Sequence, residues 1–593
     1  MKAIMVMYDS LCRRYLSVYG CRDISTPNFE RLAARAVTFD NCFIGSMPCM
    51  PARRELHTGR HNFMHRSWGP LEPFDDSMPA MLSKAGIHTH ISSDHKHYWE
   101  DGGATYHNRY TTWELARGQE GDAWKGDIRI PDASGYIPHT KPAMRETMKQ
   151  IGVGVLDDRD LVNRQYLQNE EDMPQAVTFR QGLEFIDTNH DEDNWFLTIE
   201  AFDPHEPFFA SQRFRNMYND PDYEGREFDW PSYSKVEESE AEQQRCISNY
   251  KALVTMCDDS LGRVLDAMDK YDLWKDTMLI VNTDHGFVLT EHGWWGKSRI
   301  PFYNEIAHIP MFIWDPRSGR LGERRSSLVQ NIDVAPTLLR YFGLEPTKDM
   351  CGHDLADTVA SDSKVRDVAF FGTHGEHINA TDGRYVYMRA PKPGMPVYEY
   401  TLMPTHMIGF FSPQELNTME LADPFDFTKG YRTLKMRTRF LPFGGAEKYG
   451  DLLFDLSADP GQLSPVRNEA AELRLTNAIR SCLLRHDAPD EVYARYRIPK
   501  DHEMSAEEYR EELNDWDTLT FPGLEGLYVD KEVYAFLHTF SGYSPEMLAQ
   551  FTGGLKQIAD AMHAKRIDRA FFLGFVEHLP VPEDMKKSLL DMI

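Results

Sequence analysis

The chain has 593 residues, with 65 basic and 92 acidic side chains and a formal net charge of −27. Its length is about four times the ~150 residues of a typical domain, which excludes a single small binding module. The negative charge opposes unspecific binding to nucleic acid or to anionic membranes. Hydrophobic residues at 41% and charged residues at 26% are typical of a globular protein. Because the molecule as a whole is negatively charged, an anionic substrate would need a local positive site.

Three apolar runs in the first half of the chain are typical of strands buried on both faces. They span residues 3–8, 195–202 and 278–281, and they are followed by Asp9, by Asp203 and His205, and by Asp284 and His285. Helical patterns lie between them, such as residues 28–36, where we expect Thr26 to cap the helix and Pro27 to open it. This alternation predicts an α/β fold with a mostly parallel sheet flanked by helices. Ligands bind at the carboxyl ends of the strands in such sheets.

The pattern changes after about residue 371. The segments ATDGRYVYMRA and DLLFDLSADPG contain turn dipeptides next to short strand-like runs, which predicts a smaller antiparallel sheet. From Ser505 the pattern is helical, because Ser505 and Glu508 have the spacing of a capping box and Ser544 opens another helix. We therefore predict three parts: an α/β domain at 1–370 that is expected to be catalytic, a subdomain with the small antiparallel sheet at 371–499, and a helical extension at 500–593 that is a candidate oligomer interface.

Cysteine usage and the N-terminal residues bear on the compartment. The eight cysteines form no C-x-x-C pair, which favours reduced thiols. The chain runs from Met1 and Lys2 directly into AIMVMYDS, without the longer apolar stretch of a signal peptide. No apolar run approaches the ~20 residues of a membrane span. We predict a cytoplasmic protein that binds neither membranes nor nucleic acid.

The segment CMPARRELHTGR, residues 49–60, is the most informative motif. It resembles the signature of the sulfatase family, whose core is C-x-P-x-R, at Cys49, Pro51 and Arg53, and it also has the residues that the family places at Leu56, Thr58, Gly59 and Arg60. The resemblance implies an alkaline-phosphatase-like fold, and it implies that a separate maturation enzyme oxidises Cys49 to formylglycine. The hydrated aldehyde would be the nucleophile of a covalent mechanism, and Arg53 would brace it.

The same resemblance implies a divalent cation that polarises the ester and lowers the pKa of the aldehyde hydrate. Its ligands would be Asp9, Asp284, His285 and the formylglycine at position 49. Many sulfatases have Asp-Asp where this chain has Asp9-Ser10, and Asp-Asn where it has Asp284-His285. Fewer carboxylates and one imidazole make the site less suited to calcium and more tolerant of manganese or zinc, and we keep Ca²⁺ and Mn²⁺ as the candidate ions. Phosphonate monoester hydrolases, which use the same nucleophile, also have a histidine here.

Two more residues lie where the family has catalytic side chains. Lys297, in EHGWWGKS, is at the place of a lysine that neutralises the ester oxygens. His205, in FDPHEPF, resembles the histidine of the family's P-H-x-P segment and would protonate the departing alkoxide. The resemblance thus implies that positively charged side chains face the atoms on which negative charge develops during the reaction.

One loop departs from the family. Many sulfatases have G-K-x-H after the strand that here reads GIHTHIS, but this chain continues SSDHKHYWEDGG. Asp94, His95 and His97 of this loop are candidate substrate-binding residues, although an ordinary polar loop accounts for them equally well. His292 is a further candidate, and for this side chain a role in the core or in support of other side chains is as consistent with the sequence.

Together these residues support the hypothesis of a sulfuric ester hydrolase that cleaves an aryl or carbohydrate sulfate. The alternative is a phosphonate monoester or phosphodiester hydrolase, because sulfate and phosphonate esters both present a tetrahedral anionic centre to the same nucleophile and cation. A third hypothesis is a catalytically silent binding homologue in which Cys49 is never matured. The expected partners are a small sulfate ester and the maturation enzyme, and residues 500–593 leave a homo-oligomer open.

Overall fold

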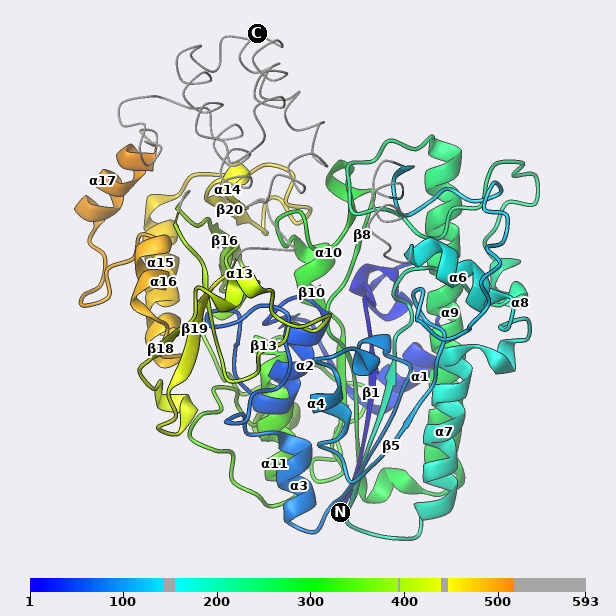
Figure 1. Ribbon diagram of the computed structural model, residues 1–593. Coiled ribbons are helices and arrows are strands. Elements are labelled where there is room, and N and C mark those ends of the chain that lie inside the picture. The colour runs from blue at the N-terminus through cyan, green and yellow to red at the C-terminus, as the bar shows by residue number, and fades with distance from the viewer. Residues whose placement is uncertain (143–144, 146–154, 393–394, 439–445, 517–593) are drawn as a thin grey trace, which may run out of the picture.

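The computed structural model describes residues 1–142, 145, 155–392, 395–438 and 446–516 (Figure 1). The strands of its central sheet are β1 Lys2–Tyr8, β2 Val37–Phe39, β4 His88–Ser93, β5 Thr112–Leu115, β6 Trp195–Ala201, β7 Thr277–Thr283, β11 Met311–Trp314 and β12 Arg324–Arg325. They are ordered β12-β2-β11-β7-β1-β6-β4-β5. The five strands from β7 to β5 run parallel, whereas β11 is antiparallel to both of its neighbours. The prediction of an α/β fold with a mostly parallel sheet is confirmed.

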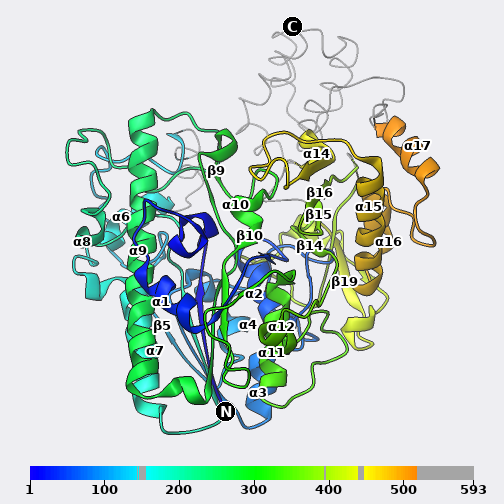
Figure 2. The ribbon, with the colours of Figure 1, turned by 180° about the vertical axis from the view of Figure 1, so that it is seen from behind.

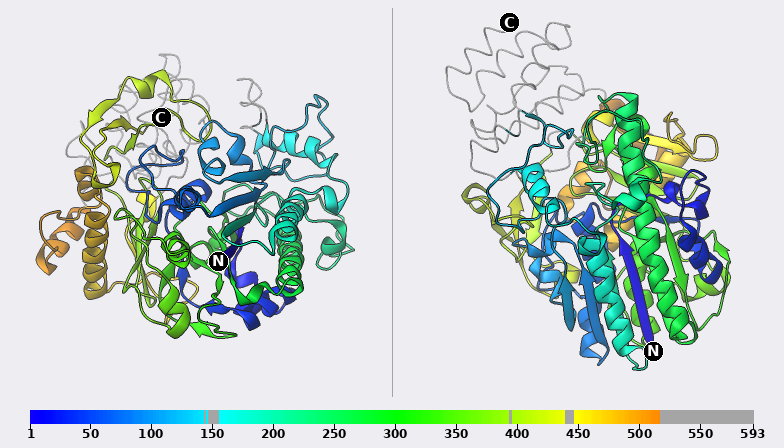
Figure 3. Two further views of the ribbon diagram at one scale, coloured as in Figure 1. Left: turned by 90° about the horizontal axis from the view of Figure 1, so that it is seen from below. Right: turned by 90° about the vertical axis from the view of Figure 1, so that its right-hand side faces the viewer.

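Strand β1 shows why the central strands are apolar along their whole length. Ala3, Met5 and Met7 pack into the core on one face of the sheet, whereas Ile4 and Val6 pack into the core on the other face. Successive side chains of a strand point to opposite faces, so a strand covered on both sides has apolar residues throughout. Helices cover both faces (Figure 3): α1 Pro27–Arg35, α7 Pro174–Asn189 and α9 Glu240–Lys270 on one, and α2 Cys49–Thr58, α3 Met78–Lys84 and α11 Val334–Tyr341 on the other.

The start of α1 differs from the prediction. Thr26 occupies the N-cap position, but its side chain makes no capping hydrogen bond; its hydroxyl oxygen instead accepts a hydrogen bond from the backbone N–H of Ser17 at 3.0 Å. The N–H groups of Asn28 and Phe29 donate to the carboxylate of Asp258 in α9, at 3.1 and 2.8 Å. The carboxylate of Asp258 in α9 therefore caps the first turn of α1, a role that the sequence predicted for the side chain of Thr26.

A smaller antiparallel region follows the central sheet, as predicted (Figure 2). One sheet consists of β14 Ala369–Gly372, β15 Ile378–Thr381, β16 Tyr385–Arg389 and β20 Leu452–Asp455, and another of β17 Tyr398–Thr401, β18 Glu420–Ala422 and β19 Thr433–Arg437. The helix α15 Glu469–Arg485 packs against β15 and β16. The predicted capping box opens α17 Ala506–Trp516, where the N–H of Glu508 donates to the Ser505 hydroxyl. The helix predicted from Ser544 lies outside the described residues, and the domain boundaries stay predictions.

Shorter α-helices and strands lie between these elements in the part of the chain that the structure describes. They are β3 Cys42–Phe43, α4 Ala104–His107, α6 Leu156–Arg164, α8 Gln212–Arg215, β8 Val288–Leu289, β9 Trp295–Gly296, α10 Asn304–Ala307, β10 His308–Ile309, β13 Val329–Gln330, α12 Ala356–Ser361, α13 Pro413–Leu416, α14 Ala446–Tyr449 and α16 Asp490–Arg495. Within the described ranges, no helix combines the length and the apolar character needed to cross a bilayer.

The pairing register brings three strand ends to the same place. Tyr8, the last residue of β1, lies opposite Ala201 of β6 and opposite Thr283 of β7. Because these strands are parallel, the residues that follow them leave the sheet at one edge. Asp9 and Asp284, which are more than 270 positions apart in sequence, therefore begin neighbouring loops.

Candidate functional site

Four side chains meet beyond the carboxyl ends of β1 and β7. Asp9, Cys49, Asp284 and His285 are buried, and each offers one potential metal-ligating atom within 4.8 Å of the others. The Sγ atom of Cys49 lies 3.3 Å from Nε2 of His285 and 3.8 Å from Oδ1 of Asp9. The structure therefore brings together all four residues for which the sequence predicted metal binding.

The entry to α2 fixes Cys49 in this cluster. Cys49 is the first residue of the helix, and the chain before it is held from two sides. The N–H of Ser46 donates to Glu55 of α2 at 2.6 Å, and the N–H of Met47 donates to the carbonyl of Gly372 at 2.8 Å. Glu55 of α2 thus fixes the loop that leads into this helix, and β14 fixes the same loop from the other side.

Arg53 lies one helical turn after Cys49 and faces three carboxylates. Its Nε donates to Glu200 at 2.7 Å, one terminal nitrogen donates to Asp284, and the other lies 3.0 Å from Oδ2 of Asp9. It also donates to the carbonyl of Cys49 at 3.0 Å. Burial opposes the charge of Arg53, but Asp284, Glu200 and Asp9 outweigh it and raise its pKa well above the usual value. Arg53 thus joins the first turn of α2 to carboxylates on or directly after three strands, β1, β6 and β7.

Sequence reasoning missed Glu200, the carboxylate of β6 that orients Arg53. Glu200 is 1% exposed, and its second oxygen accepts a hydrogen bond from the hydroxyl of Tyr98 at 2.7 Å. Both oxygens are thus satisfied inside the protein. The signal was present as one acidic residue within the apolar run WFLTIEAF, because a charge in a doubly covered strand needs a buried partner.

Lys297 supplies a second buried cation. Its Nζ donates to the hydroxyl of Ser10 at 2.9 Å and lies 3.6 Å from both Cys49 Sγ and Asp9 Oδ1. Burial opposes its charge, but the combined charge of Cys49, Glu206, Asp9 and Asp284 raises its pKa above the usual value. Burial and the charge of Asp9 also raise the pKa of the Cys49 thiol. The structure therefore places a buried ammonium group beside Cys49, Asp9 and Ser10.

Two histidines approach the same cluster. Nδ1 of His205 lies 2.5 Å from the carbonyl oxygen of Glu206, and burial lowers the pKa of the ring. Nε2 of His95 lies 3.8 Å from Oδ2 of Asp9. Among the described residues, neither this nitrogen nor that oxygen has a hydrogen-bond partner. Of the loop residues singled out by sequence, His95 is the one whose ring reaches the cluster.

The other loop candidates make contacts elsewhere. Asp94 accepts hydrogen bonds from the N–H of Phe202 at 2.7 Å and from Gln119 at 3.0 Å, and Gln119 also donates to Asp203. His97 pairs with Glu100 at 2.6 Å. Asp94 therefore ties together the loops that follow β4 and β6.

His292 lies apart from these loops. Its Nε2 is 3.3 Å from Glu305, and its ring stacks on Tyr303 with centroids 3.7 Å apart. These contacts are those of a supporting side chain, which was one of the two roles left open by the sequence.

The donor set fits a divalent cation. When all three are ionised, the carboxylates of Asp9, Asp284 and Glu200 carry one more negative charge than Arg53 and Lys297 neutralise. Burial and the charge of Asp9 raise the pKa of Asp284 to about 8, as expected where a buried site has an excess of negative charge. His285 donates from Nδ1 to the carbonyl of Gly286 at 3.0 Å, which directs Nε2 towards Cys49. Two carboxylates and one imidazole suit an ion that accepts both oxygen and nitrogen ligands.

Comparison with known proteins gives one family. A model of the sulfatase family matches residues 2–344. An arylsulfatase of Clostridium perfringens is 26% identical over 407 residues, which cover 64% of this chain and 82% of the relative. A choline-sulfatase of Rhizobium meliloti is 23% identical over 369 residues, which cover 58% of this chain and 67% of the relative.

Solved structures show the same fold. A phosphonate monoester hydrolase of Agrobacterium radiobacter has a TM-score of 0.56 at 17% identity, with 82% of this chain and 96% of the other covered. A protein solved in complex with its substrate D-glucosamine-2-N,6-O-disulfate has a TM-score of 0.56 at 17% identity, with 83% of this chain and 99% of the other covered. The alkaline-phosphatase-like fold is therefore confirmed.

Replacing Arg53 tests its role as the counter-charge of the cluster. In chelator-treated protein, we expect Arg53→Met to lower the free energy of unfolding by about 3–5 kcal/mol, because it leaves buried carboxylates unpaired. The matched control is Arg31→Met, which removes a half-exposed arginine paired with Asp266 and Asp269 and should cost about 0–1 kcal/mol. Denaturant unfolding measures both changes. Equal losses in the two variants would contradict this role.

Proposed function

The chain belongs to the sulfatase family, and from this premise we propose that it hydrolyses an aryl or carbohydrate sulfate monoester through a formylglycine formed from Cys49. The observation that carries the proposal is the position of Cys49. It is the first residue of α2, in a complete signature segment, and its Sγ lies within 4 Å of His285, Lys297 and Asp9. That sulfur marks the place that an oxygen of the matured side chain would take.

The matured side chain explains why a cysteine stands at this position. The aldehyde hydrate has two hydroxyl groups, of which one attacks sulfur and displaces the alcohol. The other then loses its proton, expels sulfate and restores the aldehyde. A covalent intermediate divides one difficult displacement into two easier steps. An ordinary serine ester would need an external water molecule for the second step.

The buried cations and His205 would act on the two ends of the scissile bond. Lys297, beside Cys49 and Ser10, is placed to neutralise the charge that grows on the sulfate oxygens, and such preorganised charge is usually a large part of catalysis. Arg53 would hold residue 49 in a fixed position relative to the carboxylates of Asp9 and Asp284. Nε2 of His205, whose ring is oriented through Nδ1, would exchange the proton of the leaving alcohol.

Asp9, Asp284, His285 and residue 49 would hold a divalent cation in this site. When bound, the cation would polarise the ester and lower the pKa of the attacking hydroxyl. We propose Ca²⁺ or Mn²⁺, and the imidazole of His285 among the ligands favours Mn²⁺ over Ca²⁺, which prefers an all-oxygen set.

A phosphonate monoester or phosphodiester is the second candidate substrate. His285 and Ser10 depart from the commonest sulfatase pattern, and the phosphonate monoester hydrolase of Agrobacterium radiobacter shares the fold. Both ester classes place a tetrahedral anionic centre beside the nucleophile. The choice between them therefore rests on how strongly the site binds each transition state.

Replacing Cys49 tests the proposed nucleophile. With the maturation enzyme co-expressed, the wild-type chain should release sulfate from para-nitrophenyl sulfate, and Cys49→Ala should lose this activity because no hydrate can form. Cys21→Ala is the matched control, since Cys21 is a partly exposed thiol of the loop before α1, and it should keep wild-type activity. Sulfate release by Cys49→Ala at the wild-type rate would contradict the proposal.

The ratio of two specificity constants tests the ester class. We expect kcat/KM for para-nitrophenyl sulfate to exceed that for para-nitrophenyl phenylphosphonate by about ten-fold or more, because the ratio reports differential binding of the two transition states. A preference for the phosphonate would reverse the ranking. Metal binding without hydrolysis of any ester would instead support the silent homologue.

A further inference from the structure

Glu206 is a buried acidic residue beside the proposed catalytic side chains, and no step of the proposed mechanism uses its carboxylate. It lies in FDPHEPF, the segment that follows β6, and it is 1% exposed. Its neighbour His205, the proposed proton donor to the leaving alcohol, is 3% exposed. A buried charge is costly unless other groups of the protein stabilise it. The contacts of Glu206 therefore indicate what its charge does.

A tyrosine fixes one oxygen of this carboxylate. The hydroxyl of Tyr233 donates a hydrogen bond to Oε1 of Glu206. Burial and the charge of Glu206 raise the pKa of Tyr233 well above its usual value, so the hydroxyl keeps its proton and remains a donor. This hydrogen bond holds the carboxylate in one orientation, in which its second oxygen faces His205.

The second oxygen, Oε2, lies 3.3 Å from Nδ1 of His205. It is buried and makes no hydrogen bond within the described part of the chain. The carbonyl oxygen of Glu206 lies 2.5 Å from the same ring nitrogen. Both are acceptor oxygens, an arrangement that favours a hydrogen on Nδ1. A second proton, which makes the ring a cation, would then be bound at Nε2.

The charge of Glu206 is available to His205. Burial lowers the pKa of His205, and Glu206 opposes this shift more strongly than the other two carboxylates that act on the ring, Asp9 and Glu120. Glu120 lies 3.0 Å from Lys96, and Asp9 is one of the proposed cation ligands. In the described ranges, no lysine or arginine forms an ion pair with Glu206. The ring of His205 is therefore the group that can balance this charge at contact distance.

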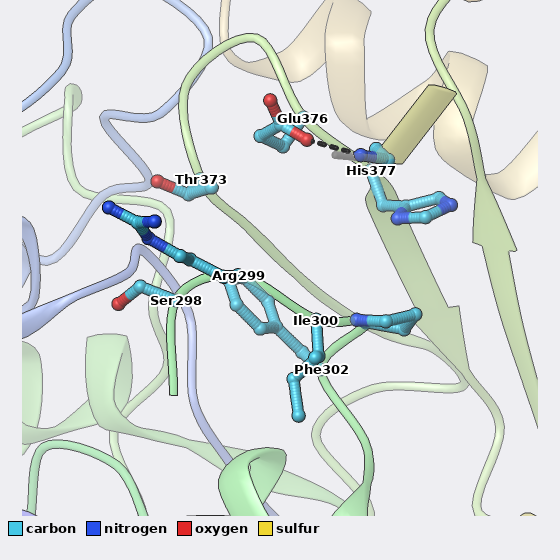
Figure 4. A pocket seen from close by; sticks show the side chains of 9 residues that line it. Ser298, Arg299, Ile300, Phe302, Thr373, Glu376 and His377 are labelled. Atoms are coloured by element: carbon cyan, nitrogen blue, oxygen red, sulfur yellow. Dashed lines mark hydrogen bonds between the residues drawn. The ribbon is translucent and has the colours of Figure 1, made fainter. Parts of the chain in front are cut away.

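The basic side chains of the segment around residue 297 have other contacts. Lys297 donates to the hydroxyl of Ser10 at 2.9 Å, and the charge of Glu206 acts on it only at longer range. Arg299 lines a separate cavity of about 20 Å³, where its guanidinium points to the same side as the hydroxyl of Thr373 (Figure 4). Neither cation thus replaces His205 as the partner of Glu206.

We propose that Glu206 is a positioning residue for the proton transfer to the leaving alcohol: its carboxylate stabilises the charged ring of His205 and orients Nε2 towards the ester oxygen. This inference rests on the proposed function and adds a residue to it. When the bond between sulfur and the ester oxygen breaks, its electron pair stays on that oxygen and takes the proton of Nε2, and the ring becomes neutral. Before this step, the carboxylate offsets the cost of burying the charged ring.

Two aryl sulfates with different leaving groups test this role. A phenol has a pKa of about 10, so phenolate is a strong base that needs a proton to leave readily. The para-nitrophenolate ion is a much weaker base and leaves without one. We expect Glu206→Gln to lower the ratio of kcat/KM for phenyl sulfate to kcat/KM for para-nitrophenyl sulfate by about ten-fold or more. Ion chromatography of released sulfate gives both values on one preparation, so the ratio does not depend on the folded or matured fraction.

Further variants assign the effect to the proposed proton donor. His205→Asn should also lower the ratio, and adding Glu206→Gln to it should change the ratio by less than about two-fold, because both side chains act on one step. Tyr233→Phe removes the hydrogen bond that fixes Glu206 and should lower the ratio by about two-fold or more. Glu472→Gln is the matched control, because Glu472 is also buried and accepts a hydrogen bond from a tyrosine hydroxyl, that of Tyr509, but lies on α15; it should keep the wild-type ratio.

The outcomes separate this role from the proposed function. Equal losses for both esters in Glu206→Gln would overturn the role, because a general defect lowers both values alike. A full further loss in the double variant would also overturn it. If Glu206→Gln does not fold, an unchanged ratio in Tyr233→Phe has the same meaning. Each of these results leaves the sulfatase proposal intact, whereas a wild-type enzyme that hydrolyses neither ester would refute the proposed function and the role of Glu206 with it.

Discussion

The structure of the site depends on one buried arginine. The guanidinium of Arg53 meets Asp9 after β1, Asp284 after β7 and Glu200 in β6, so a single side chain joins carboxylates from three parallel strands. Without it, these carboxylates would repel one another in a region from which water is excluded. Because Arg53 is also one turn from Cys49 on α2, the same contact fixes the distance between the proposed nucleophile and the strand ends.

The charge balance of the site explains what it can bind. When the three carboxylates are all ionised, Arg53 and Lys297 leave one of their negative charges uncompensated, and this favours the binding of a divalent cation. A molecule that is acidic overall can bind an anionic ester only through local positive charge, which Lys297 and the cation would supply in the proposed chemistry.

The sequence allowed the fold and the ligand cluster to be predicted, but not the contacts that support them. Asp9, Asp284 and His285 could be placed together because each follows an apolar run, and parallel strands end at one edge. Glu200 was not predicted as a residue of the site, because its partner Arg53 lies 147 positions away in sequence. Thr26 was wrongly expected to cap α1, because Asp258 of a distant helix takes that role. Local patterns predict elements and their ends, whereas partners brought together by packing have no local signal.

The most direct measurement of the central claim is the mass of the peptide that contains residue 49, taken from enzyme that hydrolyses a sulfate ester. We expect Cys49 to have lost its sulfur and two hydrogen atoms and gained one oxygen, and the modified fraction to rise with kcat across preparations. Fully active enzyme in which residue 49 is entirely an unmodified thiol would contradict it.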